Sequence, residues 1–216
     1  MLEKWCEKYW LYVLYMLGFL MAILLVVNWN NWSSHSILVC TMTIILPLHV
    51  LEEWKLPGGF HYQYNTFFSS DIPNGYPMNR LTDMITNFLA EILFIALIPF
   101  SSQSGILMGL LIFCVLEVIV HTVFGISMFK KFREKGKKTI YGVGSVTAYL
   151  GFGVLSIFLF VSLTNVTISA VDCFVALLLL LFMFGVLIFL PERLLKNKNN
   201  KYAFNSTGYF EKFLKK

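Results

Sequence analysis

The sequence predicts an all-α protein, a polytopic membrane helix bundle with six transmembrane helices in a single membrane domain. Two features of its composition support this prediction. Hydrophobic residues make up 57% of the 216 positions and charged residues only 13%, about half the charged fraction of a soluble domain. The mean hydropathy is accordingly high, at +0.70. A third observation is that the apolar residues gather in runs of roughly 20, the length that crosses a bilayer.

The apolar runs define the expected helices. They lie at about residues 9–29, 35–51, 82–100, 104–128, 139–163 and 168–190. Each run can cross a hydrocarbon core of roughly 30 Å as a helix. Pro47 lies inside the second run, where a kink is tolerated if neighbouring groups satisfy the freed carbonyl. The four cysteines lack disulfide or zinc-binding spacing, so we expect them to act as small hydrophobic residues.

The loops predict the orientation of the bundle. The connections near residues 30–35, 101–104 and 164–167 contain no charged residue, whereas a basic run at 130–138 and a basic tail at 191–216 lie on the other side. The positive-inside rule therefore places both termini in the cytoplasm, in a multi-pass protein of the cell membrane. We interpret the net charge of +5 as a sign of contact with membrane lipids, and not with nucleic acid. Proteolysis of inside-out vesicles should therefore cut the tail, and a tail cut only in intact cells would refute this orientation.

The segment 56–80 is polar, aromatic and rich in turn residues, including Pro57, Pro73 and Pro77. At about 25 residues it is longer than ordinary connections, which favours a functional loop or a lid at the membrane interface. The alternative is a disordered or lipid-lying connector. His61 lies in this segment, and we expect it to be a solvated loop histidine.

The most informative motif ends the second apolar run. His49, Glu52 and Glu53 are spaced i, i+3 and i+4, so a helix places all three on one face. Pro57 and the glycines that follow it end this helix. The sequence thus predicts a site at a helix end, beside a tight turn.

Two further pairs of polar residues lie inside apolar runs. Asn87 and Glu91 in the third run, and Glu117 and His121 in the fourth, are each spaced i, i+4. Counted at ~1.5 Å per residue from the cytoplasmic boundary, His49 lies ~9 Å deep, Asn87 ~10 Å and His121 ~14 Å. Because these depths overlap, we expect the three helices to direct their polar faces at one pocket.

Charge balance indicates what this pocket holds. A lone ionised carboxylate in hydrocarbon costs ~2.5 kcal/mol or more, and these helices offer no Lys or Arg at matching depth. A proton or a metal must balance the charge. We predict that His49, Glu53, Glu117 and His121 bind a divalent metal. Histidine with glutamate favours zinc, and iron is also possible.

The remaining polar residues suggest catalytic roles. We expect Glu91 to serve as a ligand or general base, and Asn87 to polarise a carbonyl oxygen or to support a ligand. Glu52 lies about 100° around the helix from Glu53, so one binds the metal while the other positions it. Asp83 is explained by its place at a helix N-terminus. The leading hypothesis is a metal-dependent hydrolase whose lipid or lipidated substrate enters laterally.

Two other classes of function stay open. A proton-coupled or ion-coupled transporter could relay ions through the same carboxylates. A non-catalytic membrane protein could use them as a hydrogen-bonded structural core. No inverted repeat supports the transporter hypothesis. Di-iron proteins use repeated ExxH pairs, which the sequence lacks.

The motif also carries a family resemblance. Residues 49–53 (HVLEE), followed by residues 57–60 (PGGF), resemble the signature of the HXXEE-domain family of bacterial integral membrane proteins. The resemblance covers most of residues 35–165. It implies a membrane location and assigns His49, Glu52 and Glu53 to the family motif, but it implies no particular reaction.

Overall fold

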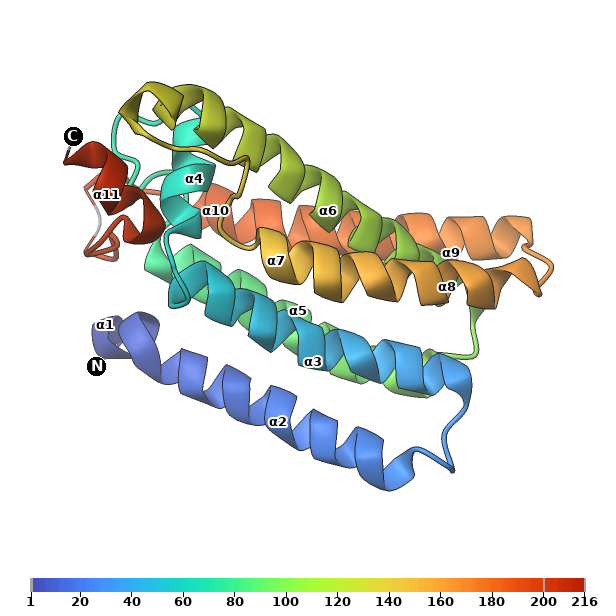
Figure 1. Ribbon diagram of the computed structural model, residues 1–216. Coiled ribbons are helices and arrows are strands. Elements are labelled where there is room, and N and C mark those ends of the chain that lie inside the picture. The colour runs from blue at the N-terminus through green and yellow to red at the C-terminus, as the bar shows by residue number, and fades with distance from the viewer. Residues whose placement is uncertain (1, 200, 216) are drawn as a thin grey trace.

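The computed structural model describes residues 2–199 and 201–215, which contain no strand. Six helical segments are long and apolar enough to cross a membrane, which confirms the predicted all-α bundle. Figure 1 shows them packed lengthwise, with both termini at the same end. They span Leu2–Asn28, Ser34–Trp54, Arg80–Phe100, Ser104–Lys135, Ser145–Thr164 and Ala170–Leu195.

Most spans combine several helical elements, and three short elements lie outside the spans. The spans consist of α1 (Leu2–Lys4), η1 (Trp5–Tyr9) and α2 (Trp10–Asn28); α3 (Ser34–Trp54); α5 (Arg80–Leu97) and η2 (Ile98–Phe100); α6 (Ser104–Phe132) and η3 (Arg133–Lys135); α7 (Ser145–Thr147), η4 (Ala148–Gly153) and α8 (Val154–Thr164); and α9 (Ala170–Leu181), η5 (Phe182–Phe189) and α10 (Leu190–Leu195). Outside them lie α4 (Phe60–Phe67), η6 (Gly208–Phe210) and α11 (Glu211–Leu214). The fifth span begins at Ser145, later than the expected 139, because the chain turns at Gly144.

The local sequence of α3 explains why its last turns can present a site. Ser33 caps the helix start, where its hydroxyl accepts a hydrogen bond from the Ser36 amide at 3.1 Å. Pro47 stays within the helix, and a Cβ on Gly18 of α2 would lie only 2.8 Å from its ring. The two helices therefore pack closely at Pro47. α3 ends at Trp54, one residue after the predicted motif.

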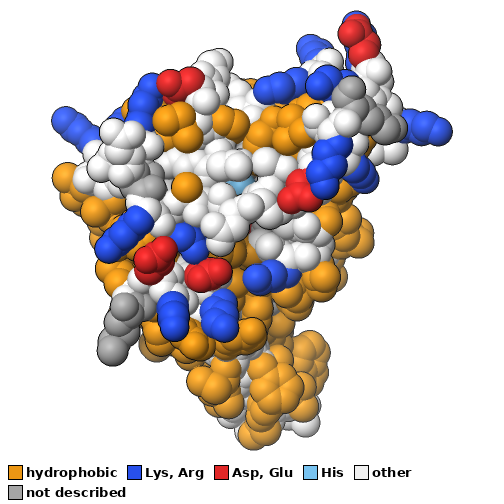
Figure 2. Space-filling model, turned by 90° about the vertical axis from the view of Figure 1, so that its left-hand side faces the viewer, with side chains coloured by type: hydrophobic (Ala, Val, Ile, Leu, Met, Phe, Trp, Pro, Cys, Tyr) orange, Lys and Arg blue, Asp and Glu red, His pale blue; other side chains and the backbone are white. Residues whose placement is uncertain are grey.

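The end of the bundle that carries both termini is rich in charged side chains. We call it the charged end and define it as residues 55–79, 133–144 and the described part of 196–215. Figure 2 views this end and shows Lys, Arg, Asp and Glu side chains spread across it, while hydrophobic side chains cover the flanks. The connections at the opposite end contain no charged residue. This distribution is the one that the positive-inside rule associates with the cytoplasmic side.

The chain after α10 folds back over residues 58–62 and the C-terminal end of α6. The Tyr209 amide donates to the Gly58 carbonyl at 3.0 Å, and Phe210 is completely buried. Gly59 has φ +106°, and a Cβ there would lie 2.5 Å from the Thr207 carbonyl oxygen. Only glycine lets the tail pass this closely. The predicted basic tail, where the structure describes it, is thus packed against the bundle as a cover.

His61 shows the effect of this cover. We expected it in solvent, but α4 and the tail bury it, with 5% of its surface exposed. Its ring stacks on Phe204 with centroids 3.7 Å apart and planes inclined by 3°. Burial lowers the pKa of His61 to about 3, so it is neutral in the folded state at neutral pH.

We therefore predict that acid loosens this cover. Below the unfolded-state pKa of about 6.5, the unfolded chain binds a proton at His61 that the folded chain does not bind. Stability attributable to this group is complete above pH 6.5 and declines as the pH falls, by about 2 kcal/mol between pH 7 and pH 5. His61→Phe keeps the aromatic stacking and should remove this part of the pH dependence. Unfolding in detergent at both pH values measures it, and an equal pH dependence in wild type and variant would contradict it.

Candidate metal centre

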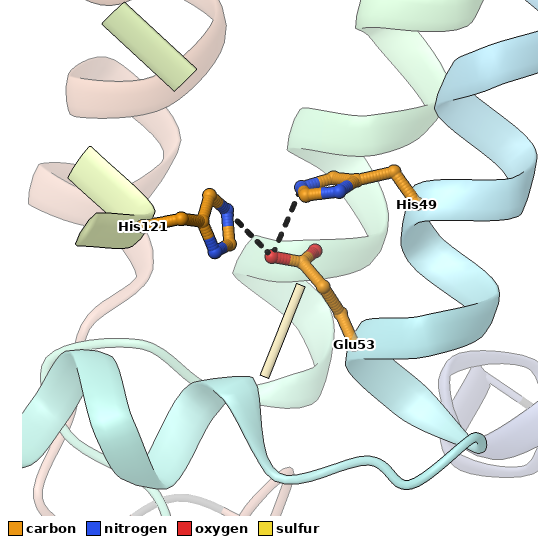
Figure 3. Close-up of side chains that lie close together, drawn as sticks. All are labelled: His49, Glu53 and His121. Carbon is orange, nitrogen blue, oxygen red and sulfur yellow. Dashed lines mark ion pairs between the residues drawn. The ribbon is translucent and has the colours of Figure 1, made fainter. Parts of the chain in front are cut away.

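The last turns of α3 and the middle of α6 bring three potential ligands together. His49 and Glu53 share one face of α3, and His121 approaches them from α6 (Figure 3). Glu53 Oε1 lies 3.3 Å from His49 Nε2 and 3.6 Å from His121 Nε2. One ligand atom of each residue lies within 4.8 Å of the other two, so this group could hold a metal ion.

Glu117 is the fourth predicted ligand, and the structure places it beside these three residues but outside the group whose ligand atoms all lie within 4.8 Å of one another. It precedes His121 by one turn of α6, and its Oε2 lies 3.6 Å from His121 Nε2 and 3.8 Å from His49 Nε2. The side chain of Glu117 is 20% exposed, whereas those of the other three are 5% exposed or less. We call these four residues the His–Glu cluster. Glu117 is therefore the member of the cluster that is most accessible from outside.

The spacing of His49, Glu53 and His121 is compatible with three ligands around a common centre, and Glu117 lies beside both imidazoles. Ligand atoms about 2.1 Å from a tetrahedral zinc ion would lie about 3.4 Å from one another. The four nitrogen–oxygen separations range from 3.3 to 3.8 Å. Direct charge-assisted hydrogen bonds are shorter, at about 2.7–2.9 Å. The groups are therefore spaced more like ligands than like directly bonded pairs.

The charges of the cluster also fit a divalent cation. In residues 2–199 and 201–215, no Lys or Arg lies within ion-pair distance of Glu53 or Glu117. With neutral imidazoles, the two carboxylates contribute two negative charges inside the bundle. Such charges are retained only with a compensating partner.

Hydrogen bonds fix which ring nitrogens face the centre. Nδ1 of His121 lies 3.0 Å from the Val143 carbonyl oxygen, which can only accept, so Nδ1 carries the proton. Nδ1 of His49 lies 2.8 Å from Thr147 Oγ1, whose hydroxyl donates to Glu52 Oε2 at 2.6 Å. The His49 Nδ1 therefore donates to Thr147. This assignment leaves both Nε2 atoms unprotonated, as metal binding requires.

Glu52 faces the start of the fifth span instead of the cluster centre. Its carboxylate accepts hydrogen bonds from the Val146 and Thr147 amides at 3.2 and 2.8 Å, and from the Tyr141 hydroxyl at 3.0 Å. An acidic group at a helix N-terminus is favourable. Glu52 thereby joins α3 to α7 and holds the threonine that orients His49.

The segment 141–147 is shaped to fit His121. Gly144 has φ +88°, and a Cβ at this position would collide with the His121 ring. The buried Gln63 of α4 anchors the segment, because its side chain accepts from the Val143 amide at 3.1 Å and donates to the Val143 carbonyl at 3.3 Å. The segment 56–80 thus supports the site through α4.

Asn87 belongs to a neighbouring network. Its side-chain amide donates to the Asp83 carboxylate at 2.8 Å and to the Asp83 carbonyl at 3.0 Å. The other carboxylate oxygen of Asp83 accepts from the Trp54 indole at 2.6 Å. Asp83 is buried, which its proposed role at a helix N-terminus does not explain. The i, i+4 spacing of Asp83 and Asn87 in the sequence could have predicted the hydrogen bond between their side chains.

Glu91 is completely buried but lies outside the His–Glu cluster. Neither of its carboxylate oxygens has a hydrogen-bond partner among the described residues. Glu91 and Asn87 share a face of α5, as predicted, yet only α3 and α6 supply the cluster. Sequence reasoning also missed Thr147, Tyr141 and the Val143 carbonyl.

Comparison of the chain with family models, with curated proteins and with solved structures finds no match. The resemblance of residues 49–60 to the HXXEE-domain family stays a prediction that rests on the motif. What the site can do must therefore be argued from its own geometry.

We predict that Thr147→Val weakens metal binding without removing a ligand. The variant keeps the shape of the side chain but loses the acceptor for His49 Nδ1–H, and loss of such a partner typically lowers metal affinity about 10–100-fold. Zinc titration against a competing chelator would measure the change. Thr164→Val is the matched control, since Thr164 bonds to the Val161 carbonyl at the far end of the same span. Equal zinc affinity in both variants would refute the role of Thr147.

Proposed function

We propose that the protein is a metal-dependent hydrolase of the cell membrane that acts on a lipid or a lipidated substrate. The observation that carries the proposal is the His–Glu cluster, which is buried between membrane-spanning helices and has one partly exposed carboxylate. Two histidines and a glutamate are a known ligand set of catalytic zinc sites. Zinc is the favoured metal and iron the second choice.

In this proposal the three buried residues hold the metal. His49 and His121 bind through Nε2, and Glu53 binds through its carboxylate. The two imidazoles are fixed from behind, His49 by Thr147 and His121 by the Val143 carbonyl. A divalent metal bound here would lower the pKa of a coordinated water and polarise a carbonyl or phosphoryl oxygen.

Glu117 is the residue that we assign to proton transfer. It lies beside both imidazoles and is the most exposed member of the cluster, so an incoming water and substrate would meet it first. A carboxylate in this position can accept a proton from the water and return it to the leaving group. Phe60 and Phe152, whose rings lie 5.2 Å from those of His121 and His49 respectively, limit the access of bulk water.

The proposal predicts distinct effects for the two glutamates. Protein purified without chelator should contain about one metal per chain, and Glu53→Gln should lose most of it. Glu117→Gln should keep the metal but hydrolyse a membrane lipid extract about 10²–10⁴-fold more slowly. Elemental analysis and release of radiolabelled products measure the two effects. Glu134→Gln, at an 87% exposed side chain, is the control that should change neither.

Other outcomes separate the alternatives. Loss of metal from Glu117→Gln would make Glu117 a fourth ligand, as the sequence analysis predicted. Equally negligible metal in wild type and in Glu53→Gln would end the proposal. The second candidate, proton-coupled transport, would then gain weight, because Glu91 is a buried carboxyl group without a partner among the described residues. Liposome proton flux that disappears in Glu91→Gln would support it.

A further inference from the structure

A groove of about 830 Å³ lies between α3 and the fifth span. Its walls are almost wholly apolar and contain no charged residue. Ile37, Ile45 and Leu48 of α3 form one wall, and Leu150, Val154 and Phe158 form the other. Because both walls belong to membrane-spanning segments, hydrocarbon and not water faces this groove.

The two helices touch at the floor of the groove and present large side chains along its rim. At the floor, a Cβ on Gly151 would lie 2.8 Å from Ile45 Cγ2, so the backbones approach closely there. On the rim, Leu150 is 71% exposed, and Leu48 and Phe158 are more than half exposed. The groove is therefore open to the bilayer along its side.

The groove runs from the uncharged end of the bundle to Thr147, which supports His49 of the candidate metal centre. Trp29, Ser34 and Asn165 line one end, while Leu48 and Thr147 line the other. Along α3, the 14 residues from Ser34 to Leu48 correspond to about 21 Å, which is most of a hydrocarbon core of about 30 Å.

The inner end of the groove adjoins the residue that supports the His–Glu cluster, on the Nδ1 side of His49. Thr147 Oγ1 lies 2.8 Å from His49 Nδ1, and Leu48 precedes His49 on α3. A second groove of about 490 Å³ between α6 and α8 is lined by Ile112, Leu116 and Ile157. Leu116 precedes Glu117, but within the described chain no side chain of this groove hydrogen-bonds to the cluster. Only the first groove joins an apolar channel to the hydrogen bonds that hold a ligand.

We propose that the groove between α3 and the fifth span binds one acyl chain of a membrane lipid, with the headgroup end of the chain at Thr147 and the terminal methyl group toward Asn165. The length, the apolar walls and the absence of charged lining suit a linear hydrocarbon chain. Inside a membrane, apolar contact alone gives little preference for protein over lipid, so close packing and the polar end must supply the selectivity. This inference rests on the proposed function and names the part of the substrate that the protein would recognise.

Photocrosslinking tests the proposal. The full-length protein is placed in phosphatidylcholine vesicles whose acyl chains carry a diazirine either near the headgroup or near the terminal methyl. The first probe should label residues 146–150, and the second should label residues 158–165. Val154→Trp fills the middle of the groove and should reduce labelling by the second probe about tenfold, whereas Ile157→Trp, in the second groove, should change it less than about twofold.

Three results would overturn the inference. The labels could spread evenly over all lipid-facing helices, or the two tryptophan variants could reduce labelling equally. The third is that a prenyl-chain diazirine probe labels the groove residues more strongly than the acyl probe does. The positional pattern in wild type decides the matter even where Val154→Trp fails to fold. Metal content of the same samples separates this inference from the proposed function. Ordered labelling without metal would end the hydrolase proposal alone, and metal without ordered labelling would end the groove proposal alone.

Discussion

Two carboxylates inside a membrane bundle require a positive partner, and this requirement explains the arrangement around the site. Glu53 and Glu117 come from different helices, yet neither meets a Lys or Arg side chain in the described chain. They converge instead on two imidazoles at separations suited to ligands. In a low-dielectric interior, an unpaired carboxylate would favour protonation or a different packing of α3 against α6. A shared cation would let the two helices keep this contact.

One short segment connects the cluster to the rest of the fold. Residues 141–147 supply the Val143 carbonyl to His121, the Thr147 hydroxyl to His49 and two amides to Glu52. Gln63 of α4 fixes the same segment from the charged end. A candidate ligand on α3, a candidate ligand on α6 and the cover over the charged end therefore share one support. Rigid support of this kind is what keeps metal ligands within a few tenths of an ångström of a working geometry.

The sequence predicted the spans and the four members of the cluster because both depend on local patterns. Hydropathy identified the six helices, and i, i+4 spacing with similar depth paired His49 with Glu53 and Glu117 with His121. The groups that hold the two histidines in place could not be predicted from the sequence, for a physical reason. The Val143 carbonyl has no side-chain signal, and Thr147 is almost 100 residues away from the His49 that it orients. Glu91 shows the limit of counting depth, since the rotation of α5 about its axis depends on packing that no local pattern encodes.

The same geometry distinguishes a reactive centre from a structural polar core. A core that only holds helices together gains most from short, direct hydrogen bonds with every polar atom satisfied. Glu52 has that character, with four bonds between 2.6 and 3.2 Å. The His–Glu cluster does not, because its imidazoles are held from behind while their Nε2 atoms and the facing carboxylates stand 3.3 to 3.8 Å apart. Polar groups that are rigidly supported but held apart from one another are arranged for something that binds between them. The partial exposure of Glu117 beside this space is what makes chemistry, and not only cohesion, the better account of it.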